Sequence, residues 1–190
     1  MLQHLRASIV LLALFTVLTG LIYPLALAGI GQGLLKRQAE GSPIVRNGVV
    51  VGSSLIGQAF TKPEYFWGRP SAAGKGYDAR SSSGSNLGPS SKVLVDRITD
   101  TAKRFGQPAG EIPPDLLMAS ASGLDPHISP AGARFQVKRV AAARGLSEQA
   151  VARVVDEHVE TPSLGVLGEP RVNVLELNIA LDALSRKPSQ

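Results

Sequence analysis

The chain has 190 residues, a net charge of +5, no cysteine, and 44% hydrophobic against 18% charged residues. This balance is typical of a folded protein and excludes a disordered tail, while the lack of cysteine excludes a disulfide framework and a thiolate metal site. Basic and acidic residues are interspersed and aromatic residues make up only 5% of the chain, so no basic stripe with aromatic platforms indicates a nucleic-acid partner.

The N-terminal region is a long apolar segment without a charged residue between Ala7 and Leu35. A helix of this length spans the roughly 30 Å hydrocarbon layer of a bilayer. The alternative is a secretory signal cleaved after the A-x-A pattern of residues 26–28, but the apolar core of a signal is usually about 7–15 residues long. We therefore expect an uncleaved membrane anchor over residues 1–36 and one domain over residues 37–190.

Two residues of this segment, Gly20 and Pro24, are unfavourable in an isolated helix. A helix that packs on neighbouring membrane helices tolerates them, because small residues allow close backbone approach and freed carbonyls find partners there. Both are therefore candidate docking residues, with a mild kink facing lipid as the alternative. The flanking charges, Arg6 before the segment and Lys36 and Arg37 after it, are nearly balanced and leave the orientation of the helix open.

Residues 44–51 predict a β-hairpin, because two short β-type runs flank the pair Asn47-Gly48. Residues 58–89, which are rich in glycine, proline and serine, predict a long irregular loop, and such loops are usually functional or disordered. The adjacent Tyr65, Phe66 and Trp67 favour an ordered loop. Their rings either fill the core of the domain or form a docking surface.

Three helices are expected in the second half of the chain: one from Ser90 or Ser91 to residue 105, one over residues 129–144 and one over residues 148–158. The second and third helices follow a serine, Ser129 or Ser147, that can cap the first turn, and the first two helices end before a glycine. Apolar residues at helical spacing predict the inward faces: Leu94, Ile98, Ala102 and Phe105 in the first helix, and Val137, Val140 and Ala141 in the second. Arg134, Lys138 and Arg139 would form a basic face that is either solvated or turned to lipid or a partner.

The last element starts near Asn173, which is followed three residues later by Glu176 in the pattern of a capping box. A helix there would carry an apolar stripe of Val174, Leu177, Leu181 and Leu184. The alternation of Val172 and Val174 also permits a strand that begins at this point. With the hairpin and the helices, these elements predict an α+β fold with one membrane helix and a small sheet that contains the hairpin.

Patterns of catalytic residues are weak throughout. The sequence has no G-x-S-x-G elbow. Residues 68–75 resemble a phosphate-binding loop but have one residue too many, and Gly76 stands where the motif has Ser or Thr. Ser122, Asp125 and His127 are the residue types of a nucleophile triad, but neighbours in one short loop rarely reach the required geometry. The three histidines have no metal-ligand spacing. We expect neither a catalytic nor a metal site.

Five short blocks follow one another along the chain: residues 52–58 (GSSLIGQ), 68–71 (GRPS), 84–87 (GSNL), 120–130 (SASGLDPHISP) and 172–178 (VNVLELN). In this order they resemble the C subunit of the Kdp potassium-transporting P-type ATPases. The resemblance covers nearly the whole chain, including the N-terminal helix.

The resemblance implies a non-catalytic accessory subunit of a high-affinity, ATP-driven potassium uptake complex in the bacterial inner membrane. The helix would be single-pass with a cytoplasmic N-terminus, and the main domain would be extracytoplasmic. The implied partners are a channel-like potassium-translocating subunit, an ATP-hydrolysing P-type subunit and membrane lipid. Neither a D-K-T-G-T phosphorylation motif nor a T-V-G-Y-G filter occurs in this chain, which agrees with that role.

The family's C subunit is described as a catalytic chaperone that raises the ATP affinity of the pumping subunit. Its Ser-Gly-Gly-Ser-Asn motif, which is compared with the ABC-transporter signature, matches Ser82, Ser83, Gly84, Ser85 and Asn86 here, with Ser83 in the place of a glycine. This resemblance makes these five residues the candidate nucleotide site. No cofactor is expected to bind firmly, and ATP is expected only through the complex.

An external domain cannot reach cytoplasmic ATP, so a second interpretation is that it caps the channel-like subunit and stabilises the assembly. Candidate docking residues in the domain are Tyr65, Phe66, Trp67, Arg69, Ser122, Asp125 and His127. Two other classes of function stay open: a membrane-anchored external hydrolase that uses Ser122 and His127, and a solute-binding domain.

Overall fold

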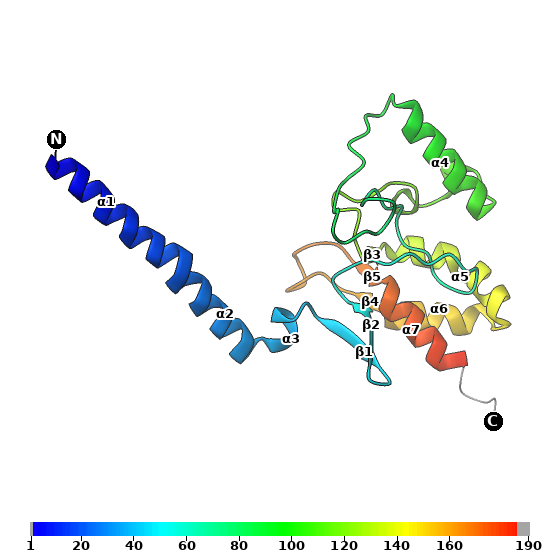
Figure 1. The fold of residues 1–190 in the computed structure, drawn as a ribbon. Helices are drawn as coiled ribbons and strands as arrows, with labels where there is room; N and C mark the ends of the chain where they lie inside the picture. The colour runs from blue at the N-terminus through cyan, green and yellow to red at the C-terminus, as the bar shows by residue number, and fades with distance from the viewer. Residues whose placement is uncertain (1, 186–190) are drawn as a thin grey trace. The chain divides into compact units, whose positions relative to one another are not determined.

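The computed structural model describes residues 2–185 and contains two compact units, Met1–Val51 and Gly52–Gln190. Both helices and short sheets are present, which confirms the predicted α+β fold (Figure 1). Each unit is described separately below, as unit 1 and unit 2.

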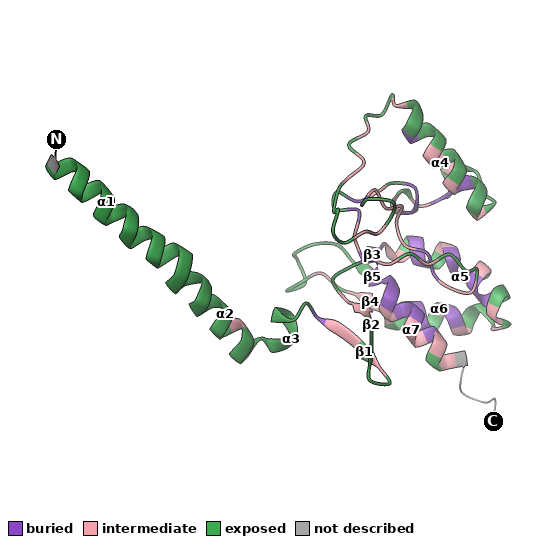
Figure 2. Cartoon of the chain, viewed as in Figure 1, coloured by how far each residue is buried: buried purple, intermediate pink, exposed green. Residues whose placement is uncertain are grey.

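Unit 1 begins with an almost continuous helix, built from α1 (Leu2–Val17), a π-helical turn η1 (Leu18–Ile22) and α2 (Tyr23–Leu34). The part from Gln3 to Leu34 has 32 residues and is long and apolar enough to cross a membrane by length and composition. The π-turn directly precedes Pro24, whose ring and missing N–H are incompatible with the α-helical bond to Gly20. Nearly every described side chain of this helix is exposed (Figure 2).

The rest of unit 1 contains a short helix α3 (Lys36–Ala39) and the predicted hairpin, β1 (Pro43–Arg46) and β2 (Val49–Ser53), whose last two residues belong to unit 2. Asn47 and Gly48 both have positive φ, +51° and +78°, as a type I′ turn requires. The hairpin is confirmed, and it forms a two-stranded sheet of its own. The expected small sheet that contains the hairpin is therefore present, and it consists of β1 and β2.

Unit 2 contains four α-helices among the described residues, α4 (Lys92–Phe105), α5 (Pro130–Arg144), α6 (Glu148–Glu157) and α7 (Val174–Ser185), and two short 3-10 turns, η2 (Ala109–Glu111) and η3 (Pro114–Leu116). The predicted caps are confirmed, because the side chains of Ser129 and Ser147 accept hydrogen bonds from the first turns of α5 and α6. Gly106 and Gly145 end α4 and α5 in the left-handed conformation.

A second sheet has the strand order β3-β5-β4, where β3 is His127–Ile128, β4 is Val159–Glu160 and β5 is Arg171–Asn173. All pairings are antiparallel. The predicted helix is confirmed as α7, which begins at Val174. A strand is also present, but β5 ends at Asn173 and does not continue to Val174 as the alternation permitted. The Asn173 side chain accepts hydrogen bonds from the N–H groups of Leu175 and Glu176 and so caps the helix.

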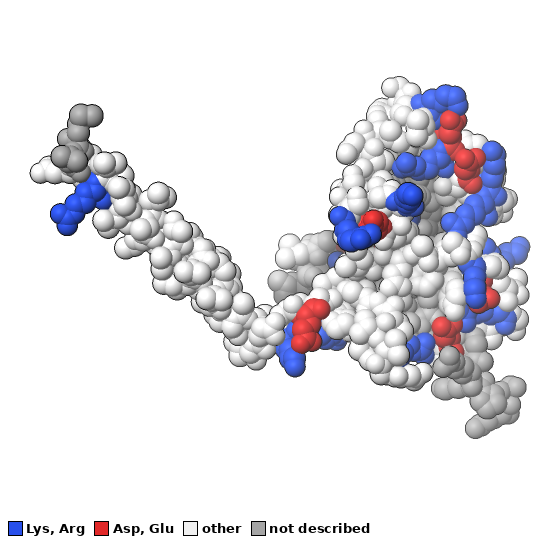
Figure 3. Space-filling model, in the orientation of Figure 1, with Lys and Arg blue, Asp and Glu red and all other residues white. Residues whose placement is uncertain are grey.

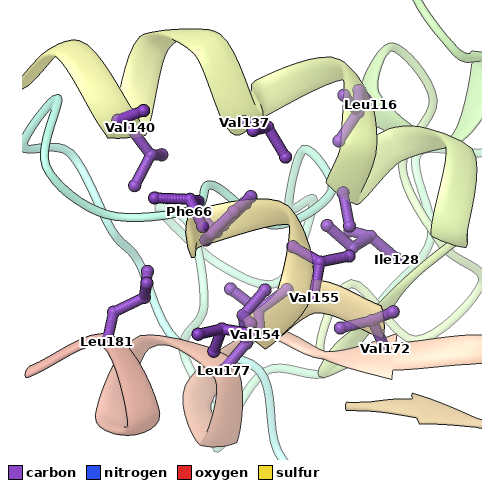
Figure 4. Close-up of a cluster of buried hydrophobic side chains, with 14 of the residues drawn as sticks. Phe66, Leu116, Ile128, Val137, Val140, Val154, Val155, Val172, Leu177 and Leu181 are labelled. Carbon is purple, nitrogen blue, oxygen red and sulfur yellow. The ribbon is translucent and has the colours of Figure 1, made fainter. Parts of the chain in front are cut away.

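The core of unit 2 lies between α5, α6, α7 and β5 (Figure 4). The inward stripe predicted for α5 is confirmed, since Val137, Val140 and Ala141 are all buried. Phe66 and Leu116, which come from segments outside the α-helices, complete this core. On the face shown in Figure 3, acidic and basic side chains alternate along α4, where Lys92 pairs with Asp96 and Lys103 with Asp100.

Candidate functional site

The aromatic segment 65–67 is fixed in the core of unit 2 by two buried side-chain amides. The backbone N–H of Phe66 donates to Asn178 Oδ1 (2.8 Å), and Asn178 Nδ2 donates to the carbonyl of Phe66 (3.0 Å). Gln136 makes the same pair of bonds with Trp67, at 2.8 and 3.0 Å. Because both amides are buried, these bonds replace the strand pairing that the irregular segment lacks.

Trp67 is also enclosed by two guanidinium groups, since Arg104 and Arg139 each lie 3.7 Å from its ring centre. Burial, together with repulsion from Arg104, lowers the pKa of Arg139 to about 10, so both groups are cationic at neutral pH. Arg139 donates to Tyr65 O (3.1 Å) and to the Gln136 side chain (2.6 Å). Arg139 therefore belongs to the set of contacts that holds segment 65–67, and not to a simple solvated face.

The three aromatic docking candidates differ in how far they are buried. Phe66 has no exposed surface and Trp67 is 7% exposed, so the rings fill the core as the alternative interpretation states. A partner cannot bind them directly. Tyr65 is half-buried and lies against Phe60, with 5.6 Å between ring centres, and beside Arg144.

The segments that carried the family resemblance meet in space. We call residues 68–73, 82–84 and 120–127 the three-loop platform. Ser71 Oγ donates to the carbonyl of Gly123 (2.6 Å) and accepts from the N–H of Tyr77 (2.7 Å). The carbonyl of Ser122 accepts from the Ser82 hydroxyl (2.9 Å) and from the N–H of Ser83 (3.0 Å). Two neighbouring loops and a third that is far from them in the sequence thus form one polar surface.

Two glycines permit this close approach. Gly123 has φ +67°, and a Cβ there would lie 2.6 Å from both Ala73 N and Ser83 O. A Cβ on Gly84 would lie 2.9 Å from the carbonyl oxygen of Ala121. Both contacts are with backbone, which cannot move aside cheaply, so the platform requires glycine at these positions.

The candidate nucleotide residues lie at the edge of this platform. Ser82, Ser83 and Asn86 are exposed, whereas Gly84 and Ser85 are half-buried. The N–H of Ser83, which would face a phosphate in a glycine-rich loop, is already bonded to the turn at Ser122. This backbone group therefore serves the fold of the platform.

Three ionisable side chains, Arg69, Asp125 and His127, lie in a row across the platform, and we call this row the charged line after its Arg69–Asp125 ion pair. Arg69 Nη1 lies 3.1 Å from Asp125 Oδ2, and the other Asp125 oxygen accepts from the His127 N–H at 3.0 Å and lies 3.4 Å from its Nδ1. Burial acts to raise the pKa of Asp125, but the hydrogen bonds from His127 and the charge of Arg69 outweigh it and lower that pKa. Asp125 is therefore ionised wherever the domain is folded at ordinary pH.

The charged line continues onto the sheet. His127 Nε2 lies 4.0 Å from Glu160, which pairs with Arg171 at 2.9 Å. Beside it is an open depression of about 350 Å³. It is lined by Arg69, Asp115, Asp125, His127, Ile128, Ser129, Glu169, Pro170 and Arg171.

The structure does not assemble a triad from Ser122, Asp125 and His127. The Ser122 hydroxyl accepts from the N–H of Leu124 (3.1 Å) and lies 3.4 Å from the Ser120 hydroxyl. Asp125 does contact His127, but within residues 2–185 no contact joins Ser122 to that ring. The arrangement orients a polar turn and does not activate a nucleophile.

The Asp125 pairings predict a specific acid sensitivity. The stability from a lowered pKa is fully present above the unfolded value, near 3.8, and is lost as pH falls through the folded pKa. We expect the urea midpoint of the wild type to fall more steeply below about pH 4.5 than that of Asp125→Asn, which cannot titrate. Equal slopes for the two proteins would contradict the assignment.

The family model described as "KdpC: K+-transporting ATPase, c chain" matches residues 5–183. The chain belongs to the KdpC family. A KdpC subunit of the potassium-transporting ATPase from Caulobacter vibrioides is 57% identical over 187 residues, which cover 96% of this chain and 94% of that protein. Its counterpart from Nitratidesulfovibrio vulgaris is 54% identical over 190 residues, with 97% and 96% covered.

The KdpC resemblance inferred from five short blocks is thereby confirmed, but the two residues that hold segment 65–67, Gln136 and Asn178, were not predicted from the sequence. They lie on the buried faces of α5 and α7, among the apolar positions predicted for those helices. An amide on an apolar helical stripe is itself a signal, since a buried polar side chain must find hydrogen-bond partners.

Proposed function

We propose that the chain is the non-catalytic C subunit of an ATP-driven potassium uptake complex in a bacterial inner membrane. The observation that carries this proposal is the family match, which runs through both the apolar helix and unit 2. The proposed partners are a channel-like potassium-translocating subunit, a P-type ATP-hydrolysing subunit and lipid. The N-terminus is cytoplasmic and unit 2 is extracytoplasmic in this arrangement.

The helix would hold the chain in the complex by packing on a neighbouring membrane helix. Its side chains are exposed along nearly all of its length, and outside the backbone of its own helix turn no atom of the described chain lies within 4 Å of a Cβ placed on Gly20. A larger residue there is therefore free of clashes with the rest of this protein and can be used to test packing on a neighbouring helix. The π-turn before Pro24 leaves backbone groups that a packed helix can satisfy.

In unit 2, the docking surface would be the three-loop platform with its charged line. Arg69, Ser122, Asp125 and His127 are at least partly exposed on it, and Tyr65 is a half-buried neighbour in sequence. The close-packed glycines and the ion pairs fix these side chains before any partner arrives. Such pre-organisation lowers the entropy lost on binding and suits a stabilising subunit.

The chain would raise the ATP affinity of the pumping subunit through assembly rather than through nucleotide contact. One observation supports this version: the N–H of Ser83 is used within the platform. The proposed extracytoplasmic placement would also separate Ser82–Asn86 from ATP. The apparent KM of the complex for ATP should therefore rise when the chain is removed and stay unchanged in a Ser85→Ala complex that is fully assembled.

The first experiment is a mild-detergent pull-down of tagged full-length chain from potassium-starved cells. Recovery of a P-type ATPase and a channel-like membrane subunit supports the proposal. Isolation of the chain alone, where both partners are demonstrably made, contradicts it.

In the same pull-down, Gly20→Leu is expected to reduce recovery of the membrane subunits about tenfold, because the new side chain separates packed backbones. Ala26→Leu, a small-to-large change elsewhere in the helix, serves as the control. If the Gly20→Leu protein copurified normally and supported full transport, the helix-packing part of the proposal would fail.

The other two classes of function can be tested directly. A solute-binding domain could use the charged depression of about 350 Å³, and a ligand there would raise the melting temperature of the chain. An anchored hydrolase would lose its activity in His127→Ala while any complex stayed intact. The separation of the Ser122 hydroxyl from the His127 ring argues against the hydrolase.

A further inference from the structure

Unit 2 carries an apolar feature that neither the core nor the platform uses. The connection between β4 and β5, residues 161–170, presents three large aliphatic side chains to solvent. Leu164 is 90% exposed, Val166 79% and Leu167 62%. We call these three residues the apolar tip. Figure 2 shows most of this connection as exposed.

The apolar tip has a defined conformation. Ser163 and Leu167 form a β-bridge with two backbone hydrogen bonds of 2.9 Å, and the N–H of Gly165 donates to Pro162 O at 2.9 Å. Leu164 has φ +55°, a left-handed conformation that is unfavourable for leucine and turns its side chain outward. At the base, Glu160 and Arg171 pair across the sheet.

Fixed, exposed aliphatic groups are costly in water and indicate a surface that a partner covers. Resting on the proposed function, we propose that the apolar tip inserts into an apolar pocket on the extracytoplasmic side of a membrane subunit of the same complex. The matched family is the c chain of a potassium-transporting ATPase, which implies other subunits that could carry this pocket. A knob whose backbone is already ordered loses little entropy when a pocket closes around it.

The composition of the connection favours a protein pocket over a lipid surface. Segments that bind the bilayer interface combine apolar residues with Lys or Arg and with aromatic rings. Residues 161–170 contain none of these, and their single charged residue is Glu169. An acidic residue near the tip is repelled by anionic head groups, whereas it can pair with a basic rim around a protein pocket.

Photo-crosslinking identifies the occupant. A benzophenone amino acid replaces Val166 in the tagged full-length chain, and cells are starved of potassium and irradiated. We expect an adduct between the chain and one membrane subunit, and no such adduct from the same amino acid at Val93, which is 58% exposed on α4. Adducts only with lipid, or only within the chain itself, would overturn the proposal.

A second measurement uses the triple variant Leu164→Ser, Val166→Ser and Leu167→Ser. We expect the amount of the membrane subunits recovered with this variant to fall about tenfold or more below that of the wild type. The control, Val93→Ser with Val95→Ser, removes exposed aliphatic side chains of α4 and should retain them normally. Normal retention by the triple variant would overturn the proposal while the subunit role stands. Absence of the subunits from the wild-type pull-down would overturn both.

Discussion

Replacing Asn178 with leucine is expected to lower the free energy of unfolding of unit 2 by about 3–5 kcal/mol. The two side chains have the same branching and the same number of heavy atoms, so leucine retains the shape of asparagine, although its methyl groups occupy more space. The substitution leaves the N–H and the carbonyl of Phe66 buried without their partners, which lie 2.8 and 3.0 Å away in the wild type. Each orphaned backbone group costs about 1–3 kcal/mol.

This loss is large beside the roughly 5–15 kcal/mol that stabilises an ordinary domain. Urea unfolding of the full-length chain in detergent measures it, and Trp67, the single tryptophan, reports directly on the segment concerned. Gln149→Leu, which also replaces a side-chain amide with leucine but at an exposed position of α6, should shift the transition by less than about 0.5 kcal/mol. If both variants unfolded alike, the amide pair would not be what holds Phe66.

The same contact explains which parts of the fold could be predicted from sequence. The Asn47-Gly48 turn and the serine caps of α5 and α6 depend on residues a few positions apart, and these predictions are confirmed. The bonds of Gln136 to Trp67 join residues 69 positions apart, and no local pattern encodes such a pairing. Sequence alone therefore left open whether the aromatic residues were core or surface.

The second sheet was missed for a different reason. Its strands β3 and β4 have two residues each and β5 has three, so none is long enough to show the alternation by which strands are predicted. They exist because tertiary contacts bring them together, with Val172 fully buried at the centre. This sheet also positions the site, since His127 belongs to β3 and both Glu160 and Arg171 lie at the base of the apolar tip.

The platform as a whole was not predicted, since the sequence indicated only Arg69, Ser122, Asp125 and His127 as separate docking candidates. The blocks around Ser71, Gly84 and Gly123 consist of small residues with hydroxyl or backbone hydrogen-bonding groups, which is what three closely packed loops require. Sequence resemblance grouped these blocks by family, and the structure supplies the physical reason for their composition. A larger side chain in one of these blocks would prevent the other two loops from approaching as closely as they do.

The most direct test of that reason is Gly123→Ala, which is expected to destabilise unit 2 by about 3–5 kcal/mol and to reduce copurification of the proposed partners. The methyl group would lie 2.6 Å from both Ala73 N and Ser83 O, so the loops must separate. Because the charged line begins on one of these loops and ends on another, Arg69 and Asp125 would also move apart.

Gly145→Ala is a matched control, because Gly145 has nearly the same φ, +65° against +67°, but nothing within 4 Å of its Cβ position. It should cost only the left-handed strain of one alanine, about 1 kcal/mol. The difference between the two urea transitions then measures the close approach of the loops apart from the strain. Equal losses would mean that the loops can separate without cost, and the platform could not then be a pre-organised docking surface.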